Sequence, residues 1–291
     1  MQLRILDTPE YLRPKCLNSF PPHQKDPRMI EERAFEHFSK KKIESNLIYL
    51  PIYWTQYHIN NNYGKYREQL AKYCDYLNKK YPNEKFFTVV QYDGGLLVPI
   101  NNCLIFASSG SFDSSVGFNS EYIPIPLLSD KHKFNITKKK KYLASFVGRL
   151  DTNNIRNKMF ESLQSINGFL IREPYKYFNQ YFYKKNMLEA HFALCPRGYG
   201  PATFRFYEAL QMNLIPIYIS DEFWLPYKDL INWNKIALLV KEANIDQIPK
   251  IINNLYYTGE YKIFLDYTSS IYNDYFTWNG CLAQIEKKIC S

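Results

Sequence analysis

The sequence predicts an α/β protein built from two doubly wound domains. Along most of the chain, amphipathic helical patterns alternate with short apolar runs rich in Ile, Leu, Val, Tyr and Phe, a pattern typical of parallel sheets covered by helices. The chain has 291 residues, whereas one domain typically has ~100–150. We therefore expect a ligand site in a cleft between two domains, because open α/β sheets bind ligands at the carboxyl ends of their strands.

The first half of the chain alternates in this way up to a polar, lysine-rich segment. The patterns predict helices and strands over residues 29–42, 47–54, 65–80, 86–91 and 103–107, the first and third of these being helices. We place a first domain over residues 1–135. Residues 129–141 are the best linker candidate, and a solvated loop within one domain is the alternative.

The second half repeats the alternation and forms a second domain over residues 136–260. Strands are expected at 143–147, 169–172, 191–195, 215–220 and 236–240, and helices at 155–166, 175–185, 204–212 and 245–257. Asn153 or Asn154 is the expected N-cap of the first of these helices.

Composition narrows the class of protein. Hydrophobic residues make up 46% of the chain and charged residues 22%, which excludes disorder as the main state. The net charge of +9 has two explanations, a nucleic-acid or membrane surface and a single anionic ligand. Because there is no basic helix, RNP motif or zinc finger, we do not expect nucleic-acid binding.

The six cysteines form no C-x-x-C pair, so neither a zinc site nor a disulfide framework is expected. No apolar stretch approaches the ~20 residues that span a bilayer. We expect a chain without a membrane span, in a reducing, cytoplasmic setting.

The most informative segment runs from Cys195 to Leu210. An apolar strand leads through Gly198 and Gly200 directly into a helix, and such a turn is an anion site, because unpaired backbone N–H groups and the helix dipole point outward. The segment also carries side chains suited to phosphate or ribose: Arg197, Thr203, Arg205 and Glu208. The alternative is an ordinary tight turn followed by a surface Arg–Glu pair.

This segment resembles the exostosin family of glycosyltransferases, family 47. The matching residues are Cys195-Pro-Arg-Gly198, Phe204-Arg-Phe206, Glu208-Ala-Leu210, Ile215-Pro216, Ser220-Asp221 and Leu225-Pro226. Upstream, Ser145-Phe-Val-Gly-Arg149 is similar to the family's F-x-G loop. The resemblance is strong over residues 143–240 and weak before them. It implies two Rossmann-like domains facing a cleft, the glycosyltransferase B architecture, in which residues 261–291 form helices that return toward the first domain.

The resemblance also implies a uridine diphosphate (UDP) sugar as donor, inversion at the anomeric carbon and a glycan acceptor. No Asp-x-Asp pair occurs among the 12 aspartates, so we expect no metal cofactor. Arginines and a helix N-terminus would then neutralise the departing diphosphate. The expected donor-binding residues are Gly148, Arg149, Arg156, Arg197, Gly198, Tyr199, Thr203, Arg205 and Glu208. For Arg156, a plain surface arginine is the alternative.

Inversion needs a general base from the first domain. Asp93, which ends a predicted strand before Gly94-Gly95, is the best candidate, and Asp113 is second, with Glu121 and His58 behind. The alternative for Asp93 is a simple turn residue.

The aromatic fraction of 17% has a candidate use, because sugar faces stack on aromatic rings. The expected acceptor-groove residues are Tyr53, Trp54, Tyr57 and Tyr92.

The chain also resembles the short exostosin-like proteins of large algal viruses. Among possible activities we favour a β-xylosyltransferase that uses UDP-xylose. The alternatives are a glycan-binding or nucleotide-binding protein on the same scaffold and a transferase that uses a guanosine diphosphate (GDP) fucose donor.

Overall fold

The computed structural model describes residues 1–16, 24–110, 117–132, 139–173 and 180–290. The chain divides into two compact units. Unit 1 comprises residues 1–127 and 277–291, and unit 2 comprises residues 128–276. The predicted boundary at residues 135 and 136 lies outside the described residues. The C-terminal segment 261–291 is divided between the two units, because α8 (Tyr261–Tyr275) belongs to unit 2 and residues 277–291 belong to unit 1.

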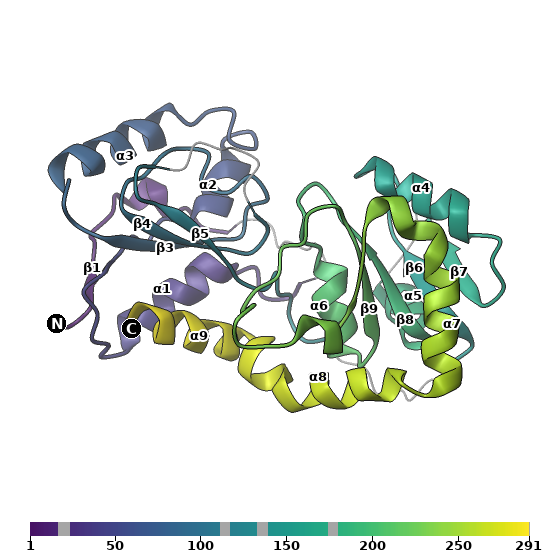
Figure 1. Ribbon diagram of the computed structural model, residues 1–291. Coiled ribbons are helices and arrows are strands. Elements are labelled where there is room, and N and C mark those ends of the chain that lie inside the picture. Colours follow the sequence, from purple (N-terminus) through teal and green to yellow (C-terminus); the bar gives the residue numbers. More distant parts are fainter. Residues whose placement is uncertain (17–23, 111–116, 133–138, 174–179, 291) are drawn as a thin grey trace. The chain divides into compact units, whose positions relative to one another are not determined.

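Unit 1 contains a parallel sheet whose strands follow each other in sequence order (Figure 1). The strands are β1 (Arg4–Ile5), β2 (Ile48–Tyr49), β3 (Phe86–Val90), β4 (Cys103–Ala107) and β5 (Glu121–Pro124). This order does not reverse among the described strands, so this part of the chain offers no topological switch point in unit 1.

Helices cover both faces of this sheet (Figure 1). The helical segments are η1 (Glu10–Leu12), α1 (Ile30–Lys40), α2 (Trp54–Asn60), α3 (Glu68–Lys80) and α9 (Trp278–Cys290). α9 is fastened to α1, because the Arg33 guanidinium lies 4.4 Å from the ring centre of Trp278 and His37 Nε2 lies 2.8 Å from Glu286 Oε2.

The predicted strand 47–54 is wrong in its second half. β2 ends at Tyr49, and Pro51 follows in a stretch that is neither strand nor helix before α2 begins at Trp54. Proline has no N–H to donate to a sheet, which explains why an apolar run of strand-like composition stops pairing there.

Unit 2 contains a second parallel sheet, ordered β10-β9-β8-β6-β7. Its strands are β6 (Tyr142–Val147), β7 (Phe169–Arg172), β8 (Ala190–Pro196), β9 (Ile215–Ile219) and β10 (Leu238–Val240). The chain moves from β6 to β7 at one edge and then returns to place β8 on the other side of β6. This reversal creates a topological switch point between β6 and β8. Open α/β sheets bind ligands at such a point, outside the carboxyl ends of the strands.

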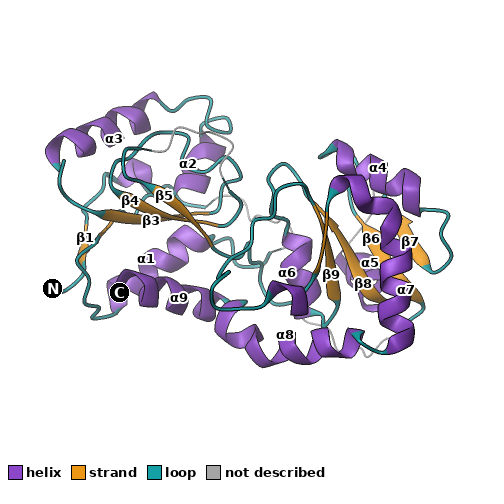
Figure 2. Cartoon of the chain, in the orientation of Figure 1, coloured by secondary structure: helices purple, strands orange, loops and turns teal. Residues whose placement is uncertain are grey.

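The helices of unit 2 enclose an apolar core around the sheet (Figure 2). With α8 they are α4 (Asn154–Leu163), α5 (Gln180–Leu188), α6 (Phe204–Gln211), η2 (Trp233–Lys235), η3 (Glu242–Gln247) and α7 (Ile248–Thr258). Asn153 is the N-cap of α4, as predicted, and its Oδ1 accepts a hydrogen bond from the Ile155 N–H at 3.1 Å. Two parallel sheets covered by helices confirm the predicted α/β class.

Described parts of the predicted linker pack on unit 2. The His132 N–H donates to Gln211 Oε1 at 3.2 Å, and Lys140 Nζ donates to the Ala190 carbonyl at 2.7 Å.

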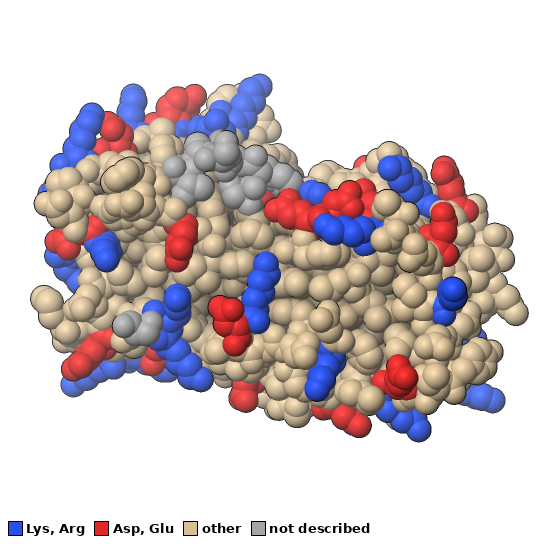
Figure 3. Space-filling model, viewed as in Figure 1, with Lys and Arg blue, Asp and Glu red and all other residues tan. Residues whose placement is uncertain are grey.

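On the face drawn in Figure 3, lysines and arginines are interspersed with aspartates and glutamates.

Candidate functional site

The glycine turn of unit 2 follows β8 and leads into α6, at the switch point of the sheet. The Arg197 N–H donates to the Ile219 carbonyl at 3.0 Å, and the Asn153 amide donates to the Gly198 carbonyl at 3.1 Å, so the turn is fixed from both sides. Tyr199 is 61% exposed, which leaves its ring free to contact a ligand. Thr203 is the N-cap residue of α6, and its side chain makes no capping hydrogen bond.

Arg156, on the first turn of α4, joins this turn to the loop after β6. Its Nε donates to the Arg197 carbonyl at 3.0 Å and its Nη1 donates to the Arg149 carbonyl at 3.0 Å. The side chain is buried, and burial, followed by the nearby Arg205, lowers the pKa of Arg156 to about 9. The guanidinium is therefore charged at neutral pH and is not the surface arginine of the alternative interpretation.

Arg205, on the first turn of α6, is buried against the loop after β6. Its Nη2 donates to the Val147 carbonyl, and its guanidinium lies 4.2 Å from the ring centre of Phe146. Gly148 makes room for this arrangement, because a Cβ at that position would collide with Arg205 Nη2. A Cβ at Gly198 would lie 3.3 Å from Arg156 Nη2. At both positions, the absence of a side chain on the glycine thus leaves room for an arginine guanidinium group.

These arginines carry charge that the described protein does not neutralise. Arg149 is paired with Asp151 at 2.7 Å on the surface, whereas Arg156, Arg197 and Arg205 have no carboxylate ion-pair partner among the described residues. The buried Nε atoms of Arg197 and Arg205 also have no hydrogen-bond partner there. Buried cations are normally paired, so Arg156 and Arg205, which act on each other electrostatically, are suited to bind an anion such as a diphosphate.

Glu208, which was expected to accept ribose hydroxyls, already has a hydrogen-bond partner on each carboxylate oxygen. Its side chain is buried, with Oε1 2.9 Å from His132 Nε2 and Oε2 accepting the Tyr183 hydroxyl at 2.5 Å. Both oxygens already serve to fix α6 to α5 and to the segment that precedes β6. Sequence reasoning missed His132 and Tyr183 because neither lies in a recognisable motif.

Asp93 lies in the turn after β3 in unit 1. The Gly95 N–H donates to the Tyr92 carbonyl at 2.9 Å, and Gly95 has a φ of 71°, which closes the turn and suits glycine. Burial raises the pKa of Asp93, and the Ser109 hydroxyl opposes that rise. Ser109 follows β4, the neighbouring strand. A carboxyl group whose pKa is raised, at the edge of the sheet where the strands end, suits a general base. Asp93 also lies in a turn, so the alternative interpretation as a turn residue describes its position as well.

The other candidate bases have less support. Asp113 lies outside the described residues. His58 is fully buried, its Nε2 lies 2.9 Å from the Leu96 carbonyl, and burial lowers the pKa of the ring to about 4. Glu121 is exposed at the start of β5, the opposite end of the strand from the expected site.

Two of the expected acceptor aromatics are core residues, so those predictions are wrong. Trp54 is fully buried and its indole N–H donates to Thr88 Oγ1 at 2.8 Å, and Tyr57 is also buried. Tyr53 and Tyr92 are only partly buried, and the Tyr92 hydroxyl donates to the Tyr63 carbonyl at 3.0 Å.

Sequence reasoning also missed a buried pair of carboxyl groups at the start of α1. Glu31 Oε1 accepts the N–H of Thr55 at 3.0 Å and that of Gln91 at 3.1 Å, so it fastens α1 to the end of β3. Burial raises the pKa of Glu31, and burial together with Glu31 raises that of Glu32 to about 7. Two acidic residues at a helix start normally only complement the dipole, which is why this pair gave no signal.

Comparison with known proteins identifies the family of the chain. The sequence model of the Exostosin GT47 domain matches residues 23–255. The chain therefore belongs to the exostosin GT47 family.

Curated relatives match over shorter segments. Exostosin-1 of Bos taurus is 37% identical over 79 residues, which is 27% of this chain and 11% of that protein. The probable glucuronosyltransferase GUT1 of Oryza sativa subsp. japonica is 37% identical over 73 residues, 25% of this chain and 18% of that protein. Exostosin-1 of Drosophila melanogaster is 28% identical over 142 residues, 42% and 19% of the two chains. The chain thus matches less than a fifth of each relative.

Among solved structures, the pneumococcal O-GlcNAc transferase GtfA in complex with UDP and GlcNAc gives a TM-score of 0.42 at 10% identity, over 89% of this chain and 59% of that one. The GtfA/B complex gives 0.45 at 10% identity, over 89% and 60%. Within the described part of the chain, no helix combines the length and apolar character needed to cross a membrane.

Proposed function

We propose that this protein is a glycosyltransferase that moves a sugar from a UDP-sugar to a hydroxyl of a glycan, with inversion and without a metal ion. The observation that carries the proposal is that the guanidinium groups of Arg156, Arg197 and Arg205 lack carboxylate partners among the described residues. A bound diphosphate supplies the missing negative charge. The N-terminus of α6 adds backbone N–H groups and the positive end of its dipole.

In the proposed reaction, Asp93 takes the proton of the acceptor hydroxyl. The hydroxyl oxygen then forms a bond to the anomeric carbon while the bond from that carbon to the UDP oxygen breaks. The negative charge that develops on the diphosphate is stabilised by Arg197 and by Arg156 and Arg205, whose guanidinium groups loop carbonyl groups already hold before the donor arrives. The partly buried Asp93 suits this role, since its raised pKa makes it a stronger base than an exposed aspartate.

Calorimetry with UDP, UDP-xylose and GDP tests the donor. We expect the two uridine nucleotides to bind wild-type protein and GDP to bind at least about tenfold more weakly, a difference of about 1.4 kcal/mol. Arg197→Ala should abolish binding. Lys158→Ala, which removes an exposed cation from the same helix as Arg156, is the matched control and should bind normally. Tighter binding of GDP would identify the GDP-sugar alternative instead.

Donor hydrolysis separates an enzyme from a binding protein on the same scaffold. Asp93→Asn should bind UDP like wild type and reduce turnover by about 100-fold or more. Asp75→Asn, an exposed aspartate on α3 paired with Lys79, is the control. Unchanged turnover in Asp93→Asn would remove Asp93 as the base, and wild-type protein that binds UDP without turnover would favour the binding protein.

A cytoplasmic location and a viral origin of the protein stay predictions.

A further inference from the structure

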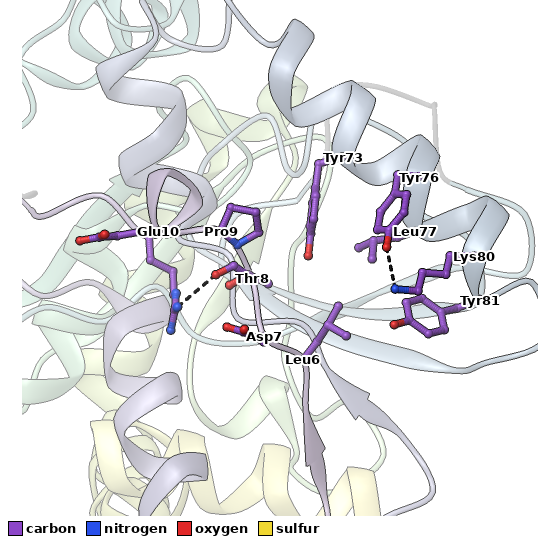
Figure 4. A pocket seen from close by; sticks show the side chains of 11 residues that line it. Leu6, Asp7, Thr8, Pro9, Glu10, Tyr73, Tyr76, Leu77, Lys80 and Tyr81 are labelled. Carbon is purple, nitrogen blue, oxygen red and sulfur yellow. Dashed lines mark hydrogen bonds between the residues drawn. The ribbon is translucent and has the colours of Figure 1, made fainter.

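A recess lies in unit 1, between the segment that follows β1 and the helix α3. It has a volume of about 530 Å³ and is lined by Leu6 and Thr8 on one side and by Tyr73, Tyr76 and Tyr81 on the other. Figure 4 shows the side chains of α3 facing this segment across the open space, with the hydroxyl end of Tyr73 directed into it. Asp93 does not line this recess, which we call the α3 recess.

Lys80 contacts two of the tyrosine rings of the α3 recess. Its Nζ donates to the Tyr76 hydroxyl at 2.6 Å and lies 5.2 Å and 5.3 Å from the ring centres of Tyr76 and Tyr81. The rings of Tyr73 and Tyr76 have centres 6.2 Å apart and are tilted by 34°. The α3 recess therefore offers several neighbouring aromatic rings to a ligand.

The charges of the α3 recess cancel. Asp7 and Glu10 on one side are matched by Arg13 and Lys80. The Arg13 Nη2 donates to the Thr8 carbonyl at 3.1 Å, while its buried Nε has no partner among the described residues. Acidic, basic and hydroxyl groups around aromatic faces provide donors and acceptors for hydroxyl groups, without a net charge that would select an anion.

We infer that the α3 recess binds a short neutral oligosaccharide and holds the acceptor glycan at sugars remote from the reacting hydroxyl. Aromatic faces pack on sugar rings, while polar rims hydrogen-bond their hydroxyl groups. The volume lies within the ~300–1,000 Å³ of small-ligand sites. The choice of a glycan rests on the proposed function, whereas the site itself rests on the lining of the recess.

The decisive experiment is calorimetry on the full chain with four tetrasaccharides and no nucleotide. The neutral probes are xylotetraose, cellotetraose and chitotetraose, and the anionic probe is tetragalacturonic acid. We expect at least one neutral probe to bind with Kd on the order of 1 mM or tighter, and the anionic probe to bind more weakly. Failure of all three neutral probes, or tighter binding of the anionic probe, would overturn the inference.

Three variants locate the binding. Tyr76 is 48% exposed, so Tyr76→Ala should fold, and we expect it to weaken binding about fivefold by removing one ring face. Tyr76→Phe keeps the face and should bind within about twofold of wild type. Tyr66→Ala removes another exposed tyrosine that lies beside a lysine in unit 1 and should bind normally. Equal binding by wild type and Tyr76→Ala would show that the sugar binds elsewhere.

UDP binding provides an independent readout. All three variants should bind UDP like wild type, because the recess contains none of the donor arginines. If wild type binds an oligosaccharide but not UDP, the proposed donor fails and the recess stands. If it binds UDP but none of the neutral oligosaccharides, the reverse holds.

Discussion

At the scale of single residues, arginines that lack anionic partners dominate the candidate donor site. Arg156 makes the point most clearly, because its two hydrogen bonds go to carbonyl groups on two different loops. Neither bond neutralises the charge. A guanidinium presents donors in a planar fork and can therefore hold both loops and still face an anion, which a lysine ammonium cannot do.

Arg156→Lys tests this geometric role. The variant keeps the positive charge but cannot reach both carbonyl groups, so we expect UDP affinity to fall about tenfold, about 1.4 kcal/mol, with the fold retained. Calorimetry gives the affinity and circular dichroism the melting temperature. Wild-type affinity in Arg156→Lys would show that only the charge matters, and an equal loss in Lys158→Ala would point to a general effect of net charge.

At the scale of elements, the sequence predicted most of the secondary structure. The second half was predictable because its strands, such as β8 and β9, are continuous apolar runs bounded by turn residues. β1 was missed because two residues are too few for a periodic pattern, and α2 was missed because its buried Trp54 and Tyr57 extend an apolar run. The order of the strands in unit 1 depends on long-range pairing, which local patterns do not encode.

The candidate donor site was predictable to a similar degree. Its glycines and arginines lie in motifs, and the structure brings Gly148, Arg156, Gly198 and Arg205 together around two loops. Glu208 lies in the same motif and on the same helix, but burial gives it a structural role. Spacing shows that two residues share a helix face, and it does not show whether that face meets a ligand or the core.

Replacing the two loop glycines tests how closely the elements fit. Gly148→Ala places a methyl group where Arg205 Nη2 lies, so we expect Arg205 to leave the Val147 carbonyl and UDP affinity to fall about tenfold or more, about 1.4 kcal/mol. Gly198→Ala brings a methyl group 3.3 Å from Arg156 Nη2, a contact that a small shift relieves. A loss in Gly198→Ala as large as that in Gly148→Ala would contradict this ranking.

At the scale of the whole molecule, stability reflects buried groups that have no part in the proposed chemistry. The carboxyl groups of Glu31 and Glu32 lie at the start of α1, and the Glu32 Oε2 accepts the Met29 N–H at 3.0 Å. Glu31 Oε2 and Glu32 Oε1 are buried without partners among the described residues. The groups whose charges act on Glu32 are Glu31, which raises its pKa, and Arg33, which lowers it.

This arrangement makes stability depend on pH in a direction that can be worked out. The pKa of Glu32 rises from an ordinary 4.5 in the unfolded chain to about 7 in the folded protein. Between these values the folded state binds more protons than the unfolded state, so its advantage is complete below about pH 4.5 and is lost as the pH rises through about 7. His58, whose pKa burial lowers to about 4, acts in the opposite direction below pH 6.5, so the melting curve of wild type alone does not isolate Glu32.

The variant Glu32→Gln isolates the contribution of Glu32 to the pH dependence of stability, because the amide oxygen can still accept the Met29 N–H while the charge is gone. The melting temperature of the variant minus that of wild type should rise as the pH increases from 5 to 8, by the equivalent of about 1–3 kcal/mol. Glu36→Gln, on the exposed side of the same helix, is the matched control. Lys40 holds the pKa of Glu36 below its usual value, so this difference should be flat over the same range. A flat difference for Glu32→Gln as well would mean that Glu32 is already ionised throughout, and that burial at the start of α1 does not oppose its charge.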